Sequence, residues 1–418
     1  MTVPDADRST GPAVTLADIR QAHDRIRSGI EHTPCPRSVA LSELTGCDVW
    51  CKLDLLQRTG SFKERGARNA MLLLDEAQRA RGVVAASAGN HALGLAYHGR
   101  LLGIPVRVVM PRFAPLVKVA TCRRLGAEVI LAGESFEDAR RMAAEMAARD
   151  GLNLVHGFDD PRVVAGQGTM ALEILADVPD LDAVVVPVGG AGLLAGVATV
   201  MKALRPEARI IAVEPVAAGS FSASLVVGAP VTVPTRPTLA DGLAVGRVGT
   251  LPFAIAGPLV DRVVTVGEEA ISLAVLRLLE LEKTVVEGAG AAPLAALLHD
   301  GCPELRGRKV VLLLCGGNID LSILDRVIEH GLAVDGRRWR FTTQVSDRPG
   351  GIAKLTAAIA AAGASVQEIV HDRAFSGADV YSAGVAVTVE TADHDHIAAL
   401  ARRLQAEGFA VAPATDVK

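Results

Sequence analysis

Short, continuous apolar runs alternate with longer segments of helical periodicity over most of this sequence. The runs are rich in valine and isoleucine and lack polar alternation, which is typical of strands buried on both faces of a sheet. Helical segments of this length can connect neighbouring parallel strands. The pattern therefore predicts an α/β fold with a mostly parallel sheet. The clearest runs are Val83-Val84, Val106–Met110, Val129–Leu131, Ala183–Val188, Ile210–Glu214 and Val310–Leu314.

The helical segments are recognised by apolar residues spaced for one buried face. Thr15 is a suitable N-cap for the first of them. The helices we expect are Leu16–Ile30, Ala67–Ala80, Ala92–Leu102, Phe136–Arg149 and Glu268–Leu281.

The pattern changes after Gly331, where a charged, turn-like stretch, Asp335–Arg338, leads into a compact final segment. Its predicted order is strand, helix, strand, strand, helix, strand, which is that of an α+β ferredoxin-like domain. We therefore expect one domain over residues 1–335 and a second over 336–418. The elements are Trp339–Val345, Ile352–Ala362, Ser365–His371, Tyr381–Glu390, His394–Glu407 and Phe409–Val411.

Charge and composition exclude several classes of partner. The chain has 418 residues, is half hydrophobic and carries a formal net charge of -4, without a basic stripe. Nucleic acid and membrane are therefore not expected as partners, and the ligand should be a small molecule. Met1–Gly11 is polar, unlike a signal peptide, and no apolar stretch is long enough to span a membrane, so we expect a cytoplasmic protein. The six cysteines show no metal-ligand spacing, so reduced thiols and no metal site are expected.

Four stretches deserve a chemical interpretation because each falls at or just after the carboxyl end of a predicted strand. Parallel α/β sheets bind their ligands at this edge. The stretches are Gly60–Ala67, Ser87–His91, Val188–Leu193 and Leu314–Asn318. Taken singly, Lys63 in the first is better explained as a solvated lysine at a helix start. The second suits either anion binding by free main-chain N–H groups or an ordinary capped turn.

The third stretch has two interpretations of its own. Its glycines allow main-chain N–H groups to close around a phosphate. Gly190–Ala195 also fits the GxGxxA pattern of a dinucleotide site, and Glu214 follows about 20 residues later, as a ribose-binding acid would. A nicotinamide-dependent oxidoreductase is therefore an open alternative on this stretch alone.

Taken together, the four stretches resemble a known family. Ser61–Gly66, Ser87–His91, Gly189–Leu193 and Cys315–Asn318 occur in the order and spacing of the serine/threonine dehydratases, which are fold-type II pyridoxal-phosphate (PLP) enzymes. Further agreement comes from Leu239–Gly242, Val286–Ala291 and Asn318–Leu321. The resemblance implies a tryptophan synthase β-like fold, with two open twisted sheets and a smaller subdomain inserted at about 82–158.

The second domain resembles an ACT regulatory module, because Ser346–Gly351 lies between its first strand and helix. Within the family, the arrangement is most similar to that of threonine ammonia-lyases with an ACT module. Such modules bind small effectors at this loop, which implies an amino acid such as isoleucine or valine, whereas a plain tight turn explains the glycines equally well. A homo-oligomer, dimer or tetramer, is expected. The loop residues are Asp347, Arg348, Pro349, Gly350, Gly351 and Ile352.

The resemblance also implies roles for individual residues. Lys63 would bond covalently to the aldehyde of pyridoxal 5'-phosphate and act as nucleophile and base, and Cys315 would meet the pyridine nitrogen. The other implied cofactor contacts are Phe62, Asn90, Gly189, Gly190, Ala191, Gly192, Leu193, Gly242 and Glu287. The implied substrate contacts are Ser87, Ala88, Gly89, Asn90 and His91.

The reaction that the resemblance implies is β-elimination of water from L-threonine, which gives 2-oxobutanoate and ammonia, with L-serine giving pyruvate. A neutral pyridine ring beside a thiol favours elimination over reprotonation. A PLP-dependent β-replacement enzyme similar to cysteine synthases, a nicotinamide oxidoreductase and a catalytically silent amino-acid sensor remain alternatives.

Three positions depart from the family pattern. Ala88 replaces a serine that serves as the second acid/base in related racemases, so we expect weak racemase activity. Ala191 replaces a glycine of the phosphate loop, although its main-chain N–H is unaffected. Glu214 resembles the first ligand of a cation site, but Ser220 stands where an aspartate is usual, so we expect no tightly bound divalent metal.

Overall fold

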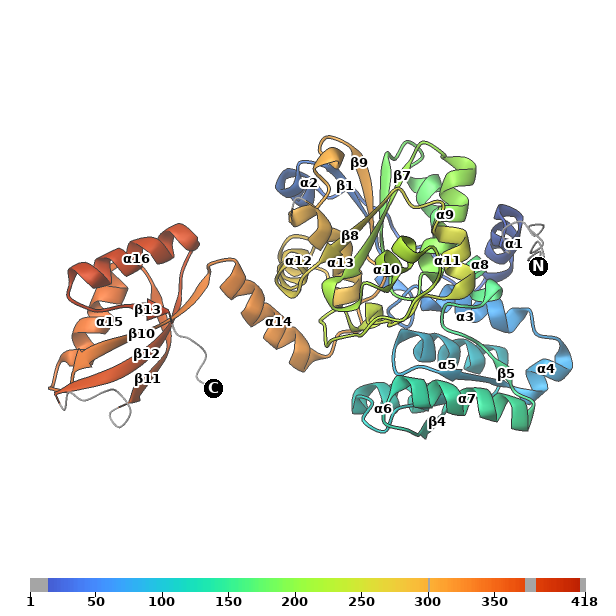
Figure 1. Ribbon diagram of the computed structural model, residues 1–418, viewed down its shortest axis with the longest axis horizontal. Coiled ribbons are helices and arrows are strands. Elements are labelled where there is room, and N and C mark those ends of the chain that lie inside the picture. The colour runs from blue at the N-terminus through green and yellow to red at the C-terminus, as the bar shows by residue number, and fades with distance from the viewer. Residues whose placement is uncertain (1–13, 300, 373–380, 414–418) are drawn as a thin grey trace, which may run out of the picture. The chain divides into compact units, whose positions relative to one another are not determined.

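The computed structural model describes residues 14–299, 301–372 and 381–413, and these form two compact units that divide after Asp320 (Figure 1). Each unit is described below by itself. The segment Met1–Gly11, for which we expect no signal peptide, lies outside the described residues. Among the described helices, none combines the length and the apolar character that a membrane span needs.

The larger sheet of the first unit has five parallel strands in the order β1-β9-β6-β7-β8. Neighbouring strands in this order are far apart in the sequence, which requires the crossover helices that the alternating pattern predicts. The strands are β1 (Asp48–Lys52), β9 (Lys309–Leu313), β6 (Ala183–Pro187), β7 (Arg209–Pro215) and β8 (Arg262–Val266).

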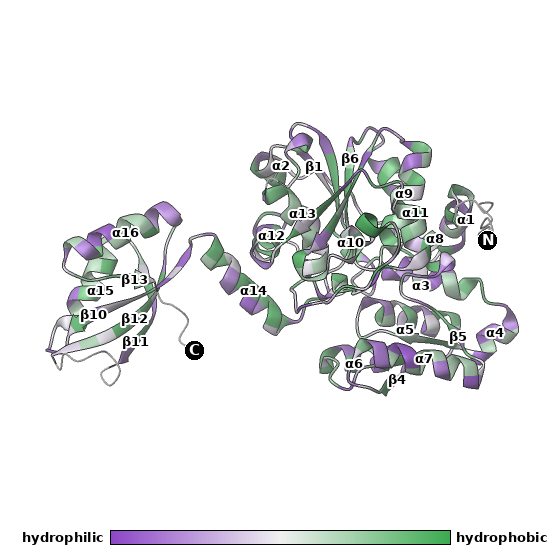
Figure 2. Cartoon of the chain, viewed as in Figure 1, coloured by the Kyte–Doolittle hydropathy of each residue, from purple (hydrophilic) through white to green (hydrophobic). Residues whose placement is uncertain are grey.

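Helices cover both faces of this sheet (Figure 1). Val184 and Val186 of β6 face a core built with α1, α8 and α9. On the opposite face α13 packs against β6, β7, β8 and β9. The central strand β6 is apolar and buried along its whole length, whereas the other strands carry polar residues mainly at their ends (Figure 2). The helices are α1 (Leu16–Ile26), α2 (Val39–Thr45), α8 (Pro161–Asp177), α9 (Gly192–Leu204), α10 (Ser220–Val227), α11 (Thr250–Ala256), α12 (Glu268–Leu281) and α13 (Gly288–Leu298).

The smaller sheet has four parallel strands in the order β4-β3-β2-β5. Val83 and Ala85 of β2 pack towards α5, whereas Val84 packs towards α7, so consecutive residues serve opposite layers. The elements are α3 (Lys63–Leu72), α4 (Glu76–Arg81), β2 (Val83–Ala86), α5 (Asn90–Leu102), β3 (Val106–Met110), α6 (Leu116–Arg124), β4 (Glu128–Leu131), α7 (Phe136–Asp150) and β5 (Asn153–Leu154).

The second unit contains an antiparallel sheet in the order β11-β12-β10-β13, with α15 and α16 contributing to its core. This is the predicted ferredoxin-like order. The elements are α14 (Leu321–Val334), β10 (Arg338–Ser346), α15 (Gly351–Ala361), β11 (Ser365–Asp372), β12 (Ser382–Glu390), α16 (His394–Ala406) and β13 (Ala412–Pro413). We retain residue 336 as the proposed start of the regulatory domain, because α14 precedes its first strand.

Three predicted elements were wrong in detail. The helix expected over Ala67–Ala80 is two helices, because the Asp75 side chain accepts a hydrogen bond from Gln78 N and caps a new helix there. The first helix ends at Ile26 rather than Ile30. The last strand is Ala412–Pro413 rather than Phe409–Val411, since it is Ala412 that pairs with Thr342 of β10.

Candidate active site

Lys63 is the first residue of α3, and its side chain is half-buried. Its Nζ donates a hydrogen bond to the main-chain oxygen of Gly157, at 2.8 Å. Removal from water lowers the pKa of Lys63 to about 8, although the neighbouring Cys315 and Glu287 act in the opposite direction. Most of this amine is still protonated near physiological pH, but its neutral fraction, which can act as a nucleophile or a base, is far larger than that of an ordinary lysine.

The turn before Lys63 is fastened to the end of β9. Phe62 N donates to the main-chain oxygen of Cys315 at 3.0 Å, and Ser61 forms an isolated bridge with Gly316. Burial raises the pKa of the Cys315 thiol, so this side chain stays a neutral S–H group. Two of the four predicted stretches are thus joined directly.

A chain of side-chain hydrogen bonds connects the second stretch with the fourth. Asn318 Nδ2 donates to Asn90 Oδ1 at 2.9 Å, and Asn90 Nδ2 donates to Glu287 Oε1 at 2.8 Å. Gly316 has no space for a side chain, since a Cβ atom there would lie 2.1 Å from Glu287 Oε1. Burial, followed by the nearby Asp241, raises the pKa of Glu287 to about 7. This carboxyl group can therefore gain or lose a proton near neutral pH.

The glycine stretch forms the turn between β6 and α9. In the part of the chain that the structure describes, no acceptor pairs with the main-chain N–H groups of residues 190–194. These groups belong to the positive end of a helix dipole and are buried. Buried N–H groups without partners are costly, so the geometry of the turn is compatible with binding of an anion such as a phosphate.

The backbone conformation of Ala191 and two close contacts fix the shape of this turn. Ala191 has a left-handed backbone with φ of 68°, which a residue with a Cβ atom adopts only with strain. The ring of Phe158 lies against Gly190, where a Cβ atom would come within 2.2 Å of it. Gly189 and Gly242 also approach each other closely, since a Cβ atom on Gly189 would lie 3.1 Å from the Gly242 oxygen.

The stretch Ser87–His91 joins β2 to α5. Ser87 Oγ accepts hydrogen bonds from the N–H groups of Gly89 and Ala92, as a helix cap does. Among the described residues, none accepts a hydrogen bond from the N–H groups of Ala88, Asn90 or His91. Both of the functions considered for this turn, capping and anion binding, are therefore compatible with its geometry.

His91 is buried, and its Nε2 lies 3.0 Å from the main-chain oxygen of Val155. Burial, followed by the charge of Lys63, lowers the pKa of His91 to about 3, so the imidazole is neutral at physiological pH. A Cβ atom on Gly157 would lie 3.5 Å from this ring. His91 therefore stands close to the lysine without adding a second positive charge.

A closed network of charges lies behind α3. Arg65 donates to Asp54 and to Glu173, in each case through two nitrogens, and all three side chains are buried. Lys52 Nζ lies 2.7 Å from Glu173 Oε2 and is also fully buried. The network fixes α3, and with it Lys63, to β1 and α8.

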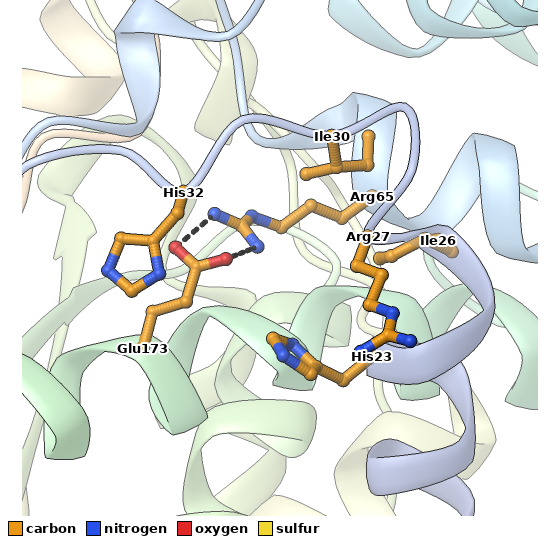
Figure 3. A pocket seen from close by; sticks show the side chains of 7 residues that line it. All are labelled: His23, Ile26, Arg27, Ile30, His32, Arg65 and Glu173. Carbon is orange, nitrogen blue, oxygen red and sulfur yellow. Dashed lines mark hydrogen bonds and ion pairs between the residues drawn. The ribbon is translucent and has the colours of Figure 1, made fainter.

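The pocket shown in Figure 3 is separate from the predicted site residues. It has a volume of about 180 Å³, and Arg65 and Glu173 form its floor. The donors of Arg65 are already used within the charge network. The remaining lining residues are His23, Ile26, Arg27, Ile30 and His32.

The hydrogen bonds of Glu214 are those of a helix cap rather than those of a nucleotide or metal ligand. Its carboxylate accepts hydrogen bonds from the main-chain N–H groups of Phe221 and Ser222 and from the Ser222 hydroxyl, so it caps α10. Burial raises its pKa. Within the described residues, no cluster of three or more His, Cys, Asp or Glu side chains could hold a metal ion.

Gly157 and Phe158 belong to this site, yet our sequence analysis did not identify them. They follow β5, and the end of a strand is the signal that revealed the other four stretches. The signal was missed because β5 has only two residues, Asn153–Leu154. The segment approaches Lys63 through Gly157 and the glycine turn through Phe158.

The predicted effector loop lies in the second unit, between β10 and α15. Gly350 has φ of +98°, and a Cβ atom on Gly351 would lie 2.0 Å from the Ser346 oxygen. Both glycines are therefore required by the backbone, whichever function the loop has. Most of the loop is exposed, including Arg348, Pro349 and Ile352.

Comparison with known proteins is consistent with this geometry. The L-threonine ammonia-lyase of Thermotoga maritima is 44% identical over 398 residues, which is 95% of this chain and 99% of that protein. The processed form of threonine deaminase isoform 2 from Solanum lycopersicum superposes with a TM-score of 0.71 at 36% identity, over 79% of this chain and 98% of that one. Maize serine racemase gives a TM-score of 0.72 at 35% identity, over 77% and 98%.

Residues 26–316 match the family described as pyridoxal-phosphate dependent enzyme, and residues 341–409 match the ACT domain. The first match spans the charge network, the lysine, the glycine turn and the end of β9. This chain therefore belongs to the family of pyridoxal-phosphate dependent enzymes and carries an ACT domain.

Proposed function

We propose that this chain is an ammonia-lyase that eliminates water from L-threonine, giving 2-oxobutanoate and ammonia, with L-serine as a second substrate. The observation that carries the proposal is a half-buried lysine amine, of pKa about 8, linked through Gly157 and Phe158 to a buried helix start whose N–H groups have no acceptor among the described residues. The similarity to L-threonine ammonia-lyases over almost the whole chain supports the choice of reaction. The family match removes the nicotinamide alternative.

The residues of the site fit pyridoxal phosphate. The unpaired N–H groups of residues 190–194 suit its phosphate, and the Lys63 amine suits its aldehyde. Phe62, Asn90, Gly242, Glu287 and Cys315 are the other residues that we expect at the cofactor. When bound, this cofactor supplies an aldehyde that bonds to amines and a conjugated ring that accepts electrons from the bond to the substrate Cα hydrogen.

The role of Lys63 follows from its environment. With a pKa near 8, the amine is neutral often enough to bond to a carbonyl carbon and, once released, to take the Cα proton onto Nζ. The Gly157 oxygen directs Nζ by accepting its hydrogen bond. His91 is neutral at physiological pH and therefore adds no second positive charge beside Lys63.

The substrate carboxylate has a suitable binding place in the turn before α5. The N–H groups of Ala88, Asn90 and His91, which have no acceptor within the described part of the chain, can donate to it. Ala88 carries no group that can donate or accept a proton on its side chain, so we propose that racemisation is slow. The Cys315 thiol stays protonated and cannot compete for the proton that Lys63 handles.

The test is release of ammonia and keto acid from L-threonine and from L-serine by the purified, PLP-loaded protein. We expect both amino acids to react. The assay is repeated with a thiol nucleophile, because a β-replacement enzyme would form a new amino acid at the expense of keto acid. Absence of keto acid from both substrates would refute the proposal, and a protein that binds amino acids without turnover would be a sensor instead.

The ACT domain implies that an amino-acid effector binds this chain. We propose that the effector is isoleucine or valine and that it binds at Asp347–Ile352. Thermal-shift titration with a panel of amino acids tests this proposal. We expect a shift with isoleucine or valine that is lost in a chain ending at residue 335, whereas no response to any amino acid would remove the regulatory role.

We also propose that the chain forms a homo-oligomer, either a dimer or a tetramer. Support comes from large apolar side chains left exposed on the first unit, including Phe113, Leu116 and Val226. Light scattering at the elution peak of a sizing column measures the mass, and a monomer would contradict the proposal. A cytoplasmic location stays a prediction, supported by the six cysteines that occur as free, buried thiols.

A further inference from the structure

Phe158 places an aromatic ring against the glycine turn of the proposed site, one residue after the hydrogen-bond partner of Lys63. It directly follows Gly157, whose oxygen is 2.8 Å from Lys63 Nζ. Its ring lies on Gly190 at the start of the anion-binding turn, where no side chain would fit. Phe158 is half-buried, so part of it remains accessible.

The backbone around Phe158 is fixed on both sides. The N–H groups of Phe158 and Asp159 donate to His156 Nδ1, at 3.3 and 2.9 Å. The Asp159 carboxylate accepts hydrogen bonds from Thr250 and Leu251 at the start of α11, each at 3.0 Å. The rings of Phe158 and His156 meet edge to face with their centroids 4.5 Å apart. Because the ring is already held in place, a ligand that binds against it causes little further loss of conformational entropy.

The position of the substrate side chain follows from the proton transfer. Lys63 Nζ must come within about 3.5 Å of the reacting centre to take the Cα proton. The β-carbon is one bond further, about 1.5 Å, so a β-methyl group lies within roughly 6 Å of Nζ. This is the region to which Gly157 and Phe158 contribute.

L-Threonine differs from L-serine by that one methyl group, and an apolar surface is what distinguishes the two. The ring of Phe62 is also near the amine, with its centroid 5.1 Å from Lys63 Nζ, but it packs against the core of the larger sheet. Ala88 is small and lies in the turn expected to hold the carboxylate. Phe158 is therefore the side chain best placed to contact the methyl group.

We propose that Phe158 is a specificity-determining residue, whose ring contacts the β-methyl group of the substrate and favours L-threonine over L-serine. The inference rests on the proposed ammonia-lyase function. It also accounts for the glycine at position 190, since a side chain there would displace the ring from its place.

The first measurement is the ratio of kcat/KM for L-threonine to that for L-serine. We expect Phe158→Ala to reduce this ratio by about tenfold, because a methyl group in an apolar pocket is worth a factor of that order. Phe158→Leu keeps part of the apolar contact and should reduce it by about threefold. Phe136→Ala, which removes a half-exposed ring at the start of α7, is the matched control and should leave the ratio unchanged.

The second measurement does not need turnover. L-2-Aminobutyrate and L-alanine lack a leaving group and differ by the same methyl group, so the ratio of their Kd values, measured by calorimetry on the PLP-loaded protein, isolates the contact. We expect Phe158→Ala to reduce the preference for L-2-aminobutyrate by about tenfold. Cofactor affinity, measured by absorbance titration, should be unchanged.

The outcomes separate the two proposals. If wild-type protein releases no keto acid, the ammonia-lyase function fails, but the Kd ratio still decides the role of Phe158. Ratios that stay within twofold of wild type in the folded variants overturn the inference. So does equal loss with both ligands together with weaker cofactor binding, since that result means that Phe158 only supports the glycine turn. Should Phe158→Ala fail to fold, an unchanged Phe158→Leu overturns the inference by itself.

Discussion

Lys52 and Lys63 are close together in the sequence, but their ammonium groups have different electrostatic surroundings. Lys52 is fully buried, with Glu173 at 2.7 Å and Asp177 at 3.8 Å as counter-charges. Lys63 is half-buried, and its Nζ donates a hydrogen bond to a neutral carbonyl oxygen, that of Gly157. Lys52 therefore has two carboxylates within 4 Å of its Nζ, whereas the Nζ of Lys63 donates to a carbonyl oxygen that carries no net charge.

The difference teaches how the same side chain becomes structural or reactive. Burial penalises an ammonium group, and counter-charges within reach offset the penalty. Among the described residues no carboxylate is in direct contact with Lys63, so the penalty appears there as a lowered pKa, which suits the role of nucleophile that we propose. The charge network around Lys52 and Arg65 in turn holds α3 in place, so the reactive lysine depends on the unreactive one.

The largest effect is expected from removing the reactive amine. Lys63→Ala should lower the rate of keto-acid release by at least about 10³-fold, because both nucleophile and base are lost. Lys63→Arg should be equally inactive, since a guanidinium keeps the positive charge but does not deprotonate. Steady-state assays measure both. An active Lys63→Arg variant would show that charge rather than amine chemistry distinguishes Lys63.

The second-largest effect is expected from replacing Lys52, the lysine that is paired with Glu173. Lys52→Met should lower the free energy of unfolding by about 3–5 kcal/mol, because Glu173 keeps a buried charge with one partner fewer. Urea unfolding measures the change. Arg140→Met is the control, since its partner Glu137 is exposed and such pairs contribute at most about 1 kcal/mol. Equal, small changes in both variants would mean that the network does not fix α3.

The third effect is a pH dependence of the free energy of unfolding, and it comes from Glu287, whose charge acts on Lys63. The pKa of Glu287 is about 7 in the folded protein, above the ordinary carboxyl value of 4.5. A raised pKa stabilises the fold below pH 4.5, and this contribution is lost as the pH rises through 7, up to about 3 kcal/mol. Unfolding of the cofactor-free protein at pH 5 and pH 8 should therefore show a steeper loss for wild type than for Glu287→Gln. Parallel curves would place the Glu287 pKa near its ordinary value.

The smallest effect is expected at Ala191, in the glycine turn between β6 and α9. Ala191→Gly should raise the free energy of unfolding by roughly 1 kcal/mol, because glycine adopts the left-handed φ of 68° without strain. Ala198→Gly, the same substitution inside α9, should lower it by about 1 kcal/mol or more. Thermal or urea unfolding distinguishes the two signs. A destabilised Ala191→Gly would mean that the turn stores no strain there.

Local patterns carried much of what could be predicted. The strand runs and the turns after them depend on neighbouring residues, so Lys63, the glycine turn and the end of β9 could be found in the sequence. Gly157 and Phe158 could not, because β5 is two residues long and gives no periodicity. The break between α3 and α4 was missed because its cause, the Asp75 cap, is a single hydrogen-bonding choice within a segment of good helix formers.

The sequence by itself determined the α/β alternation, the ferredoxin-like order of the final domain and the turns that surround Lys63, because each depends on residues a few positions apart. Only the tertiary structure decided that Lys63 has a pKa near 8 and Glu287 one near 7. The Lys63 value arises from loss of water, and the Glu287 value from loss of water together with the charge of Asp241, which belongs to a segment remote in the sequence. Burial of this kind exists only once the chain has packed, so no local pattern could have determined it.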